Sequence, residues 1–396
     1  MPGMVLHPPA SSGVMGSAGR MADAGDAAVR SARLRLGGEP LPLVGAARVY
    51  ICGITPYDVT HLGHAATFVW ADVLGSVLRL AGAEVVTSRN VTDVDDVLTR
   101  AADARGRHYD EFALGQEFAF EQDMRALGVR PPTHVPRARH HVAHVQQLAA
   151  ALLRAGKAYE GEGHVFFRGA GAVASSGLSA DRARELAAEF GDDPDGPLRE
   201  DPFDVPVWRS SGERDPAWPS PWGWGRPGWH AECAAMATAT LGHGVDVLVG
   251  GADLAFPHHE HQAAMAEAAS GVAPFARSRV HVGAVSQDGA KMAKSTGNLT
   301  LVADLLRVTT GPALRLLVLD RPWSQPWEYR PELLETASGR LDALFSAAGR
   351  PGSSPAASRA VADRLFDDLD VSGALDVAIS DGGDAARQLV RVLALG

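Results

Sequence analysis

Hydrophobic residues in the first hundred positions follow two different periods. The nearly continuous apolar run "ARVYICGI" over 47–54 predicts a buried strand. The stretch "HLGHAATFVWADVLGSVLRLAGA" over 61–83 repeats apolar residues at helical spacing and ends at a glycine-containing turn. The segment "EVVTSRNVTDVDD" over 84–96 predicts a second strand with a polar end. Strand, helix and strand in this order are typical of a parallel βαβ unit, whose ligands bind at strand C-termini and helix N-termini.

The pattern changes twice further along the chain. Residues 109–156 are helical in pattern, and "EGHVFFRG" predicts a strand, whereas 169–227, with its clustered Pro, Gly and Trp, is expected to be loop-rich. Strand and helix alternation returns with "HAECAAMATATLG", "VDVLVGGADLAF", "HHEHQAAMAEAASG" and "SRVHVGAV". After "KMAKSTGN" the pattern is helical, with a Pro-rich turn at 321–331 and a linker at 350–356. We therefore interpret the loop-rich part as an insertion between two halves of a sheet domain.

These patterns predict an α/β chain with a Rossmann-like parallel sheet, an inserted α+β subdomain and a C-terminal helical domain. The expected boundaries are a partly disordered leader over 1–45, the first half of the catalytic domain over 46–135, the insertion over 136–225, the second half over 226–300 and the helical domain over 301–396.

Composition narrows the class of protein. The 396-residue chain is 46% hydrophobic, with no apolar run long enough for a membrane span. Two cysteines cannot build a disulfide framework, which favours a cytoplasmic protein. The net charge of −10 argues weakly against a large nucleic-acid footprint, because such binding draws on Lys and Arg.

Both cysteines are candidates for a metal site. Cys52 ends the first strand, Cys233 lies in "GWHAECAAM", and His258 follows in "FPHHEHQ". Zinc favours thiolate and imidazole ligands, but three ligands this far apart must converge through the fold. On spacing alone a capping or solvated histidine cluster explains the pattern about as well.

The fourth position of such a metal site stays open at this stage. Gln262 lies one helical turn after His258, but an amide is a poor zinc ligand, and His261 and Glu260 remain alternatives. An open position could be filled by a substrate thiol, which zinc would hold as thiolate. This would distinguish cysteine from serine, because a hydroxyl binds zinc much less well.

A second group of residues suits phosphates. His61 and His64 flank Gly63 at the start of the predicted helix, where the helix N-terminus favours anions. Far downstream, "KMAKS" places Lys291 and Lys294 on a short loop that suits a pyrophosphate leaving group. Each motif alone is weak: the first is common, and the second by itself is better explained as a solvated loop.

In this order around a βαβ pattern, the motifs resemble the signature of class I aminoacyl-tRNA synthetases. "CGITPYDVTHLGH", "NVTDVDD", "GRPGWHAECAAM", "GGADLAFPHHE" and "KMAKSTGN" are similar to cysteinyl-tRNA synthetases, and more closely to the cysteine ligases of mycothiol biosynthesis. The resemblance covers about residues 46 to 340. It implies a class I synthetase-type parallel sheet (HUP) domain.

Three features favour the ligases over the synthetases. Only 101 residues follow Ser295 (396 − 295), which is short for a helical stem plus an anticodon-binding domain. Ile54-Thr55-Pro56 matches the ligases, and Gln262 stands where synthetases usually carry a glutamate zinc ligand. Two departures are Ala293, where the family usually has serine, and "EFGDDP" over 189–194 in place of an "ERGGDP"-type stretch.

The resemblance implies an ATP-dependent, AMP-forming ligase that joins L-cysteine to the amine of glucosaminyl-inositol through a cysteinyl-adenylate. It implies one Zn²⁺ on Cys52, Cys233 and His258, Mg²⁺ with ATP, and catalysis by His61, His64, Lys291 and Lys294. The expected residues around the cysteinyl-adenylate are Cys52, Gly53, Ile54, Thr55, Thr67, Asn90, Val91, Thr92, Trp229, Gly251, Ala252, Asp253 and Val285. We expect a monomer that binds neither nucleic acid nor membrane.

Purely structural roles also explain the presence of several of these residues. Trp229 fits a core position, Asn90 and Thr92 fit a strand-end turn, and Asp93, Asp95 and Asp96 fit an acidic helix start. The alternative functions are a minimal cysteinyl-tRNA synthetase and a catalytically inactive binding module. The intact histidines and lysines of both motifs argue against the inactive module.

Overall fold

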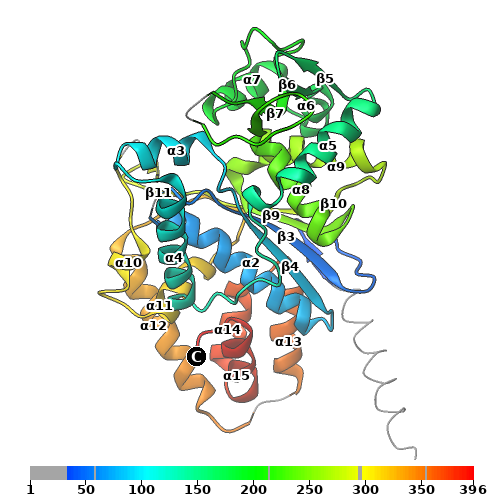
Figure 1. Cartoon of the computed structure of the whole chain (residues 1–396). Helices are drawn as coiled ribbons and strands as arrows, with labels where there is room; N and C mark the ends of the chain where they lie inside the picture. The colour runs from blue at the N-terminus through cyan, green and yellow to red at the C-terminus, as the bar shows by residue number, and fades with distance from the viewer. Residues whose placement is uncertain (1–33, 58, 213–214, 293–296, 353–354) are drawn as a thin grey trace, which may run out of the picture.

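A four-stranded parallel sheet lies at the centre of the molecule (Figure 1). The computed structural model describes residues 34–57, 59–212, 215–292, 297–352 and 355–396. The strands, in spatial order, are β10 (Ala276–Val282), β9 (Val245–Gly251), β3 (Ala47–Ile54) and β4 (Val85–Val91). Helix α2 (Leu62–Leu80) connects β3 to the parallel β4, which confirms the predicted βαβ unit.

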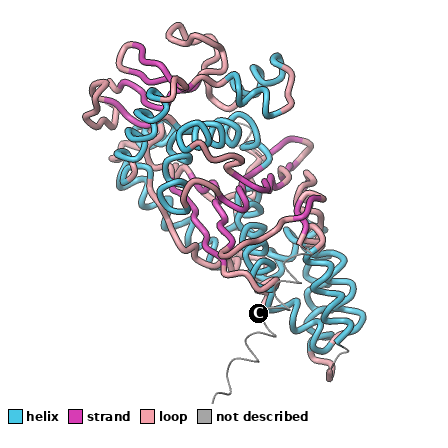
Figure 2. The backbone as a smooth tube through the Cα atoms, turned by 90° about the vertical axis from the view of Figure 1, so that its right-hand side faces the viewer, coloured by secondary structure: helices cyan, strands magenta, loops and turns pink. Residues whose placement is uncertain are grey.

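Helices cover both faces of this sheet (Figure 2). Side chains alternate along β3, so that Val49 and Ile51 join the core around α2. Tyr50 and Cys52 point to the other face and pack with α8 (Trp229–Leu241) and α9 (Glu260–Ser270). This alternation places one of the two cysteines against the helix that carries the other.

An antiparallel sheet forms the upper part of the molecule in Figure 1. Its strands are β5 (Ala158–Gly161), β6 (His164–Phe167), β7 (Val205–Ser210) and β8 (Gly225–Pro227). Three helices accompany it, namely α5 (Val142–Arg154), α6 (Ala170–Ser176) and α7 (Ala180–Glu189). One face of the sheet packs on α5 and α8 through Val165, Val207 and Ala231.

The segment 169–227 is loop-rich, as expected, but it also contains regular elements that the sequence interpretation did not place. Helices α6 and α7 and strands β7 and β8 lie within it. Both helices are short and rich in alanine, so neither shows several turns of apolar periodicity. One signal in the sequence did indicate a helix start. Ser179 precedes α7, and its side chain accepts a hydrogen bond from the Arg182 amide.

The remaining elements of this part of the molecule are a small sheet, a hairpin and several helices. A small sheet combines β11 (Val285–Gln287), β12 (Ala290–Lys291) and β13 (Trp327–Glu328). The remaining helices of this region are α3 (Asp96–Asp103), α4 (Tyr109–Ala126), η1 (Ala138–His140), η2 (Ala252–Leu254), η3 (Ala255–His259), α10 (Val302–Leu305) and α11 (Gly311–Leu319). Part of the expected leader, residues 1–33, lies outside the described residues. The part that follows forms a hairpin of β1 (Arg35–Leu36) and β2 (Glu39–Pro40).

Four helices form the lower end of the molecule in Figure 1: α12 (Pro331–Ala348), α13 (Pro355–Phe366), α14 (Val371–Asp381) and α15 (Gly383–Val392). Their apolar residues belong to the same core cluster as α2 and one face of the parallel sheet. The C-terminal helices are therefore continuous with the catalytic core.

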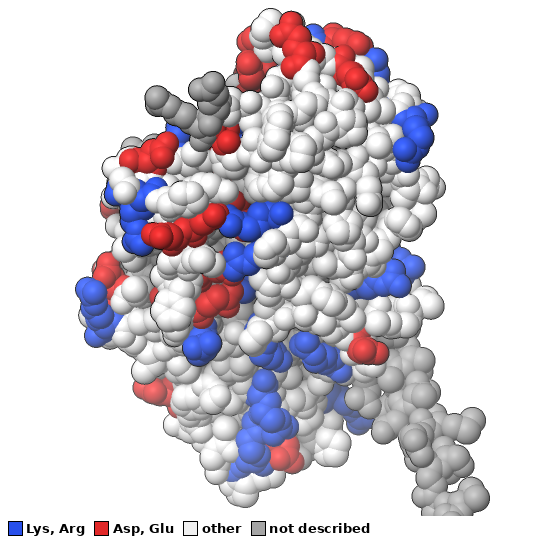
Figure 3. Space-filling model, in the orientation of Figure 1, with Lys and Arg blue, Asp and Glu red and all other residues white. Residues whose placement is uncertain are grey.

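Surface charge on the face in Figure 3 is mixed. Lys and Arg side chains lie in several separate groups with Asp and Glu between them, and acidic side chains gather at the top. Among the described helices, none is both long enough and apolar enough to span a membrane.

Candidate active site

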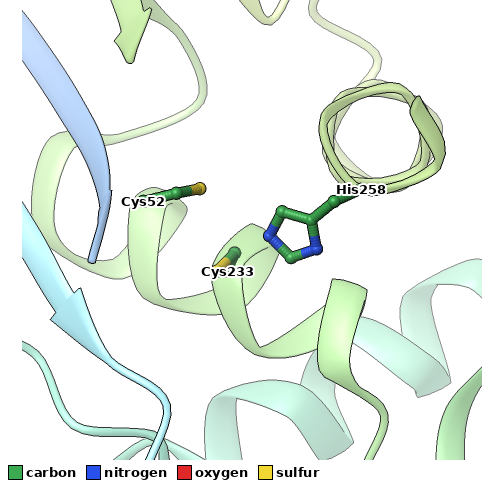
Figure 4. A group of neighbouring side chains, drawn as sticks. All are labelled: Cys52, Cys233 and His258. Atoms are coloured by element: carbon green, nitrogen blue, oxygen red, sulfur yellow. The ribbon is translucent and has the colours of Figure 1, made fainter. Parts of the chain in front are cut away.

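Cys52, Cys233 and His258 form one buried cluster (Figure 4). Each offers a ligand atom, and these atoms lie within 4.8 Å of one another. Cys52 comes from β3, Cys233 from α8, and His258 from η3 just before α9. Two thiols and an imidazole are a donor set that zinc favours, so the residues present fit this ion.

The two thiols of this cluster differ in their electrostatics. Burial raises the pKa of Cys52 well above its usual value, and Cys233 adds to the rise. Burial also acts upward on the pKa of Cys233, but contacts with Cys52 and His258 outweigh it and lower that pKa well below the usual value. The cluster therefore favours a thiolate at Cys233, and the thiolate is the form that binds metal.

A second layer of side chains orients the imidazole of His258. Its Nδ1 lies 2.9 Å from Nδ1 of His230, while Figure 4 shows its other ring nitrogen on the side of the two cysteines. Nε2 of His230 lies 3.2 Å from Oδ2 of Asp192. Partners of this kind fix the orientation and tautomer of a ligating histidine.

The three candidates for a fourth ligand separate in the structure. His261 directs Nδ1 to the Pro257 carbonyl at 2.8 Å and Nε2 to the Phe203 carbonyl at 3.0 Å. Glu260 forms an ion pair with Arg279. Only Gln262 adjoins the cluster, with Oε1 3.5 Å from Sγ of Cys52.

His259 also lies beside the cluster, and the sequence interpretation missed it. Its Nε2 is 3.2 Å from Sγ of Cys52, and its Nδ1 is 2.8 Å from Nε2 of His281. The available signal was the pair of adjacent histidines in "PHHEH", of which only the first was assigned.

His61 and His64 lie together at the N-terminus of α2. His61 is the cap residue, its Nδ1 accepts a hydrogen bond from the His64 amide, and the two rings stack at 4.2 Å. A Cβ at Gly63 would lie 3.1 Å from the His61 ring, so the glycine allows this packing. Two imidazoles at a helix N-terminus suit a phosphate.

Lys291 reaches the same region from β12. Its Nζ lies 2.9 Å from Oδ2 of Asp253, which follows β9, and 5.6 Å from the centre of the Phe190 ring. Burial acts to raise the pKa of Asp253, but Lys291 and, less strongly, His64 lower it below the usual value. The other lysine of this motif, Lys294, lies outside the described residues.

Hydrogen bonds hold the C-terminal ends of the neighbouring strands β3 and β4 together. The Gly53 amide donates to Oδ1 of Asn90 at 2.9 Å, and the hydroxyls of Thr55 and Thr92 are 2.7 Å apart. The Thr92 amide also donates to the Ile54 carbonyl at 2.9 Å. Six of the expected adenylate residues, 53–55 and 90–92, are thereby brought together.

The other expected adenylate residues form further contacts with one another and with the metal and phosphate motifs. The Trp229 ring stacks on His258 with centres 4.3 Å apart. Trp229 therefore lies directly beside the metal-ligand cluster. A Cβ at Gly251 would lie 2.4 Å from Asp253 and 3.8 Å from Thr67, and one at Gly63 would lie 3.8 Å from Val285. Ala252 begins η2 directly after Gly251.

Two members of the acidic group after β4, Asp95 and Asp96, lie at the start of α3, as the helix-start interpretation predicts. Asp95 caps α3 and accepts from the Val97 amide at 2.7 Å. Asp96 pairs with Arg209 and Arg226, each at 2.9 Å. Asp93 is fully buried and pairs with Arg139 at 2.6 Å.

The comparisons with known proteins agree with this geometry. Residues 43–339 match the family model of the class I tRNA synthetase (C) catalytic domain. A relative from Streptosporangium roseum, named L-cysteine:1D-myo-inositol 2-amino-2-deoxy-alpha-D-glucopyranoside ligase, is 41% identical over 87% of this chain and 88% of its own length. Relatives of the same name from Thermobispora bispora and Frankia alni are 41% and 43% identical, over 88% and 85% of this chain and 89% and 85% of theirs.

The fold is also found among solved structures. A methionyl-tRNA synthetase from Mycobacterium tuberculosis, in complex with methionyl-adenylate, has a TM-score of 0.59 at 16% identity, over 89% of this chain and 82% of its own. A second structure of an enzyme of this name from the same organism has a TM-score of 0.60 at 15% identity, over 88% of this chain and 84% of its own. They share this fold, and together with the family model they confirm the predicted class I synthetase-type sheet domain.

Proposed function

This chain belongs to the family of L-cysteine:1D-myo-inositol 2-amino-2-deoxy-alpha-D-glucopyranoside ligases, with a catalytic domain of the class I cysteinyl-tRNA synthetase type, and we propose that it catalyses the reaction in its relatives' name. It would join the carboxyl group of L-cysteine to the amine of glucosaminyl-inositol. ATP would be consumed, and AMP and pyrophosphate released.

One observation supports this function above the others. The buried cluster of Cys52, Cys233 and His258 lies at the end of β3, and the two histidines of the phosphate motif begin α2, the helix that follows β3. A group suited to a thiol and a group suited to phosphates are thus connected by a short loop. Activation of cysteine with ATP requires both at one site.

In the first step the cysteine carboxylate attacks the α-phosphorus of ATP and forms cysteinyl-adenylate and pyrophosphate. His61, His64 and Lys291 stabilise charge on the phosphates, and the joined ends of β3 and β4 offer backbone and hydroxyl groups to the adenylate. Lys294 belongs to this proposal through its motif. Mg²⁺ accompanies ATP and shields its phosphates.

In the second step the acceptor amine attacks the acyl carbon and AMP leaves, which forms an amide. Trp229 provides an apolar wall beside His258 that confines the cysteine side chain. When bound to Cys52, Cys233 and His258, zinc would hold the substrate thiol as thiolate and reject serine. His230 and Asp192 keep the imidazole of His258 oriented.

The alternative is a minimal cysteinyl-tRNA synthetase. The test measures AMP release by the purified chain with ATP, Mg²⁺ and cysteine, with either glucosaminyl-inositol or tRNA added. The proposal expects AMP and a cysteinyl amide only with the amino sugar. Cysteine esterified to tRNA would instead identify a synthetase.

The metal site has its own test. Cys233→Ala removes one of three ligands and is expected to lose stoichiometric zinc, as measured by metal analysis. Cysteine-dependent exchange between ATP and pyrophosphate should fall with it. Unchanged exchange in a folded Cys233→Ala protein would contradict the metal's role in cysteine binding.

The same proposal includes a monomeric enzyme in the cytoplasm, where two free thiols would stay reduced.

A further inference from the structure

A cavity of about 220 Å³ lies on the inserted sheet, and no step described so far uses it. One wall consists of His164 and Phe166 of β6 and Pro206 and Arg209 of β7, and most of residues 191–199 form the other. Val165, Phe167, Val205 and Val207 point to the opposite face, into the core with α5. The cavity therefore lies on the face of the sheet that no helix of this core covers.

The lining suits a ligand that carries several hydroxyl groups. Asp193, Arg199 and Arg209 offer charged groups of both signs, while Phe166 and Pro206 provide an apolar surface between them. Within the described part of the chain, no hydrogen bond or ion pair engages the Asp193 carboxylate. This acceptor group is available to a ligand.

Two contacts connect the cavity wall to the active site. Asp192 lines the cavity, and its Oδ2 lies 3.2 Å from Nε2 of His230, which contacts the metal-ligand candidate His258. Phe190, just before the cavity loop, lies 5.6 Å from Nζ of Lys291 on the phosphate side. The loop thus spans from the thiol side of the site to the phosphate side.

A third contact closes the opposite edge of the cavity. Arg209 pairs with Asp96 at 2.9 Å, and Asp96 opens α3 directly after the polar end of β4. The cavity is therefore connected to the metal-ligand candidates through Asp192 and to the start of α3 through Arg209. Its lining includes none of the residues assigned to the thiol or the phosphates, so a ligand held in it would not compete with those residues.

We propose that this cavity binds the acceptor, an amino sugar linked to a cyclitol, with its polyol part between β6, β7 and residues 191–199. This inference rests on the proposed function and adds the place where the second substrate binds. Hydroxyl groups on adjacent ring carbons match carboxylate and guanidinium side chains, and the C–H face of a sugar ring packs on Phe166.

The size of the cavity agrees with this ligand. A single water needs about 10–15 Å³ on the same measure, so 220 Å³ accommodates a small organic molecule. By comparison, a cavity between α2 and β4 measures about 30 Å³, and its Asp72 and Arg130 already pair with each other.

Two variants of the full-length chain test the assignment. Asp193→Asn removes a charge without changing shape, and Leu198→Trp fills the cavity from the same loop. Asp195→Asn is the matched control, because Asp195 lies two residues away, pairs with Arg184 and does not line the cavity. Each variant is assayed for cysteine-dependent ATP–pyrophosphate exchange, and for amide formation against glucosaminyl-inositol concentration.

We expect Asp193→Asn and Leu198→Trp to raise the KM for glucosaminyl-inositol about 10-fold or more, the usual effect of losing a charged hydrogen bond. Exchange should stay within about 2-fold of the unmodified chain, and Asp195→Asn should behave normally. If the unmodified chain forms the amide and both cavity variants keep its KM, the cavity assignment is overturned while the proposed function stands. If the unmodified chain charges tRNA and makes no amide, both are overturned.

Discussion

The hydrogen bonds around His258 determine which of its ring nitrogens can bind a metal. A carboxylate only accepts, so Nε2 of His230, 3.2 Å from Asp192, carries a proton. In a neutral His230 the Nδ1 is then an acceptor, and Nδ1 of His258, 2.9 Å away, must donate to it. This leaves the lone pair of His258 on Nε2, the nitrogen on the side of the two cysteines.

His230→Ala should therefore weaken metal binding although His230 is not a ligand. We expect zinc affinity to fall about 10- to 100-fold, the usual cost of losing a partner that orients a ligating histidine. Competition with a chromogenic chelator measures it. His144→Ala, on α5 beside His141, is the control. An unchanged affinity in the His230 variant would show that the hydrogen bond does not orient the ligand.

Lys291→Ala should lower the rate of cysteine activation strongly while changing the stability of the fold very little. The Lys291–Asp253 pair is about half exposed, so its contribution to the free energy of unfolding is about 0–1 kcal/mol. A positive charge aimed at phosphates in the transition state is worth far more, and we expect ATP–pyrophosphate exchange to fall roughly 10²- to 10³-fold.

Urea unfolding should detect little change in the Lys291 variant. Arg307→Ala, which breaks the exposed pair with Asp304 on α10, should alter neither property. If Lys291→Ala kept normal exchange, the role of β12 at the phosphates would be wrong.

At the scale of elements, the contact between the ends of β3 and β4 depends on one missing side chain. A Cβ at Gly53 would lie 1.8 Å from the Asn90 carbonyl oxygen. Gly53→Ala must therefore separate the two strand ends and their paired hydroxyls, and we expect loss of ATP–pyrophosphate exchange together with a lower melting temperature.

Gly115→Ala provides the matched control for Gly53→Ala. Gly115 lies inside α4, and a Cβ there would meet nothing within 4 Å. This change should raise stability by about 0.5–1 kcal/mol, because alanine is the better helix former. Normal activity in a Gly53→Ala protein would show that the strand ends can move apart without harm.

The same elements show what the sequence could and could not predict. Strand β3, helix α2 and strand β4 were predictable because each follows the period of its own secondary structure. The insertion's short alanine-rich helices α6 and α7 were not, since neither is long enough to show a period. The contact between Asp192 and His230 could not be predicted either, because it joins a loop to a helix far along the chain, and no short sequence pattern indicates such a contact.

At the scale of the whole molecule, a buried ion cluster joins the nucleotide-side helix to the C-terminal half. Asp72 of α2 accepts from Arg130 at 2.8 Å and pairs with the fully buried Arg315 of α11. Arg315 also donates to the carbonyls of Leu127, at 3.0 Å, and Leu393. One guanidinium thus holds together the end of α4, helix α2 and the segment after α15.

Asp72→Asn should destabilise the fold by roughly 3–5 kcal/mol at pH 7, because Arg315 would remain buried without its anionic partner. Burial acts to raise the pKa of Asp72, but Arg130 and Arg315 outweigh it and lower the pKa below 3.8. The carboxylate therefore stabilises the fold above its unfolded pKa, and this contribution is lost as the pH falls through the lower folded pKa.

Urea unfolding between pH 7 and pH 3 should thus show the difference between Asp72→Asn and the unmodified chain shrinking at the acidic end. Asp384→Asn, which breaks an exposed pair with Arg387, should cost about 0.5 kcal/mol or less. A constant difference across the pH range would mean that the charge of Asp72 contributes nothing.

The shared core has a consequence for how this protein is made. Helices α12 to α15 contribute to the same apolar cluster as α2 and the parallel sheet, and they leave the ribosome after every strand of that sheet. Until then the part of α2 that contacts α13 and α15 lacks these partners and leaves apolar side chains exposed. The parallel sheet is therefore expected to reach its full stability only once these helices have been synthesised and packed against it.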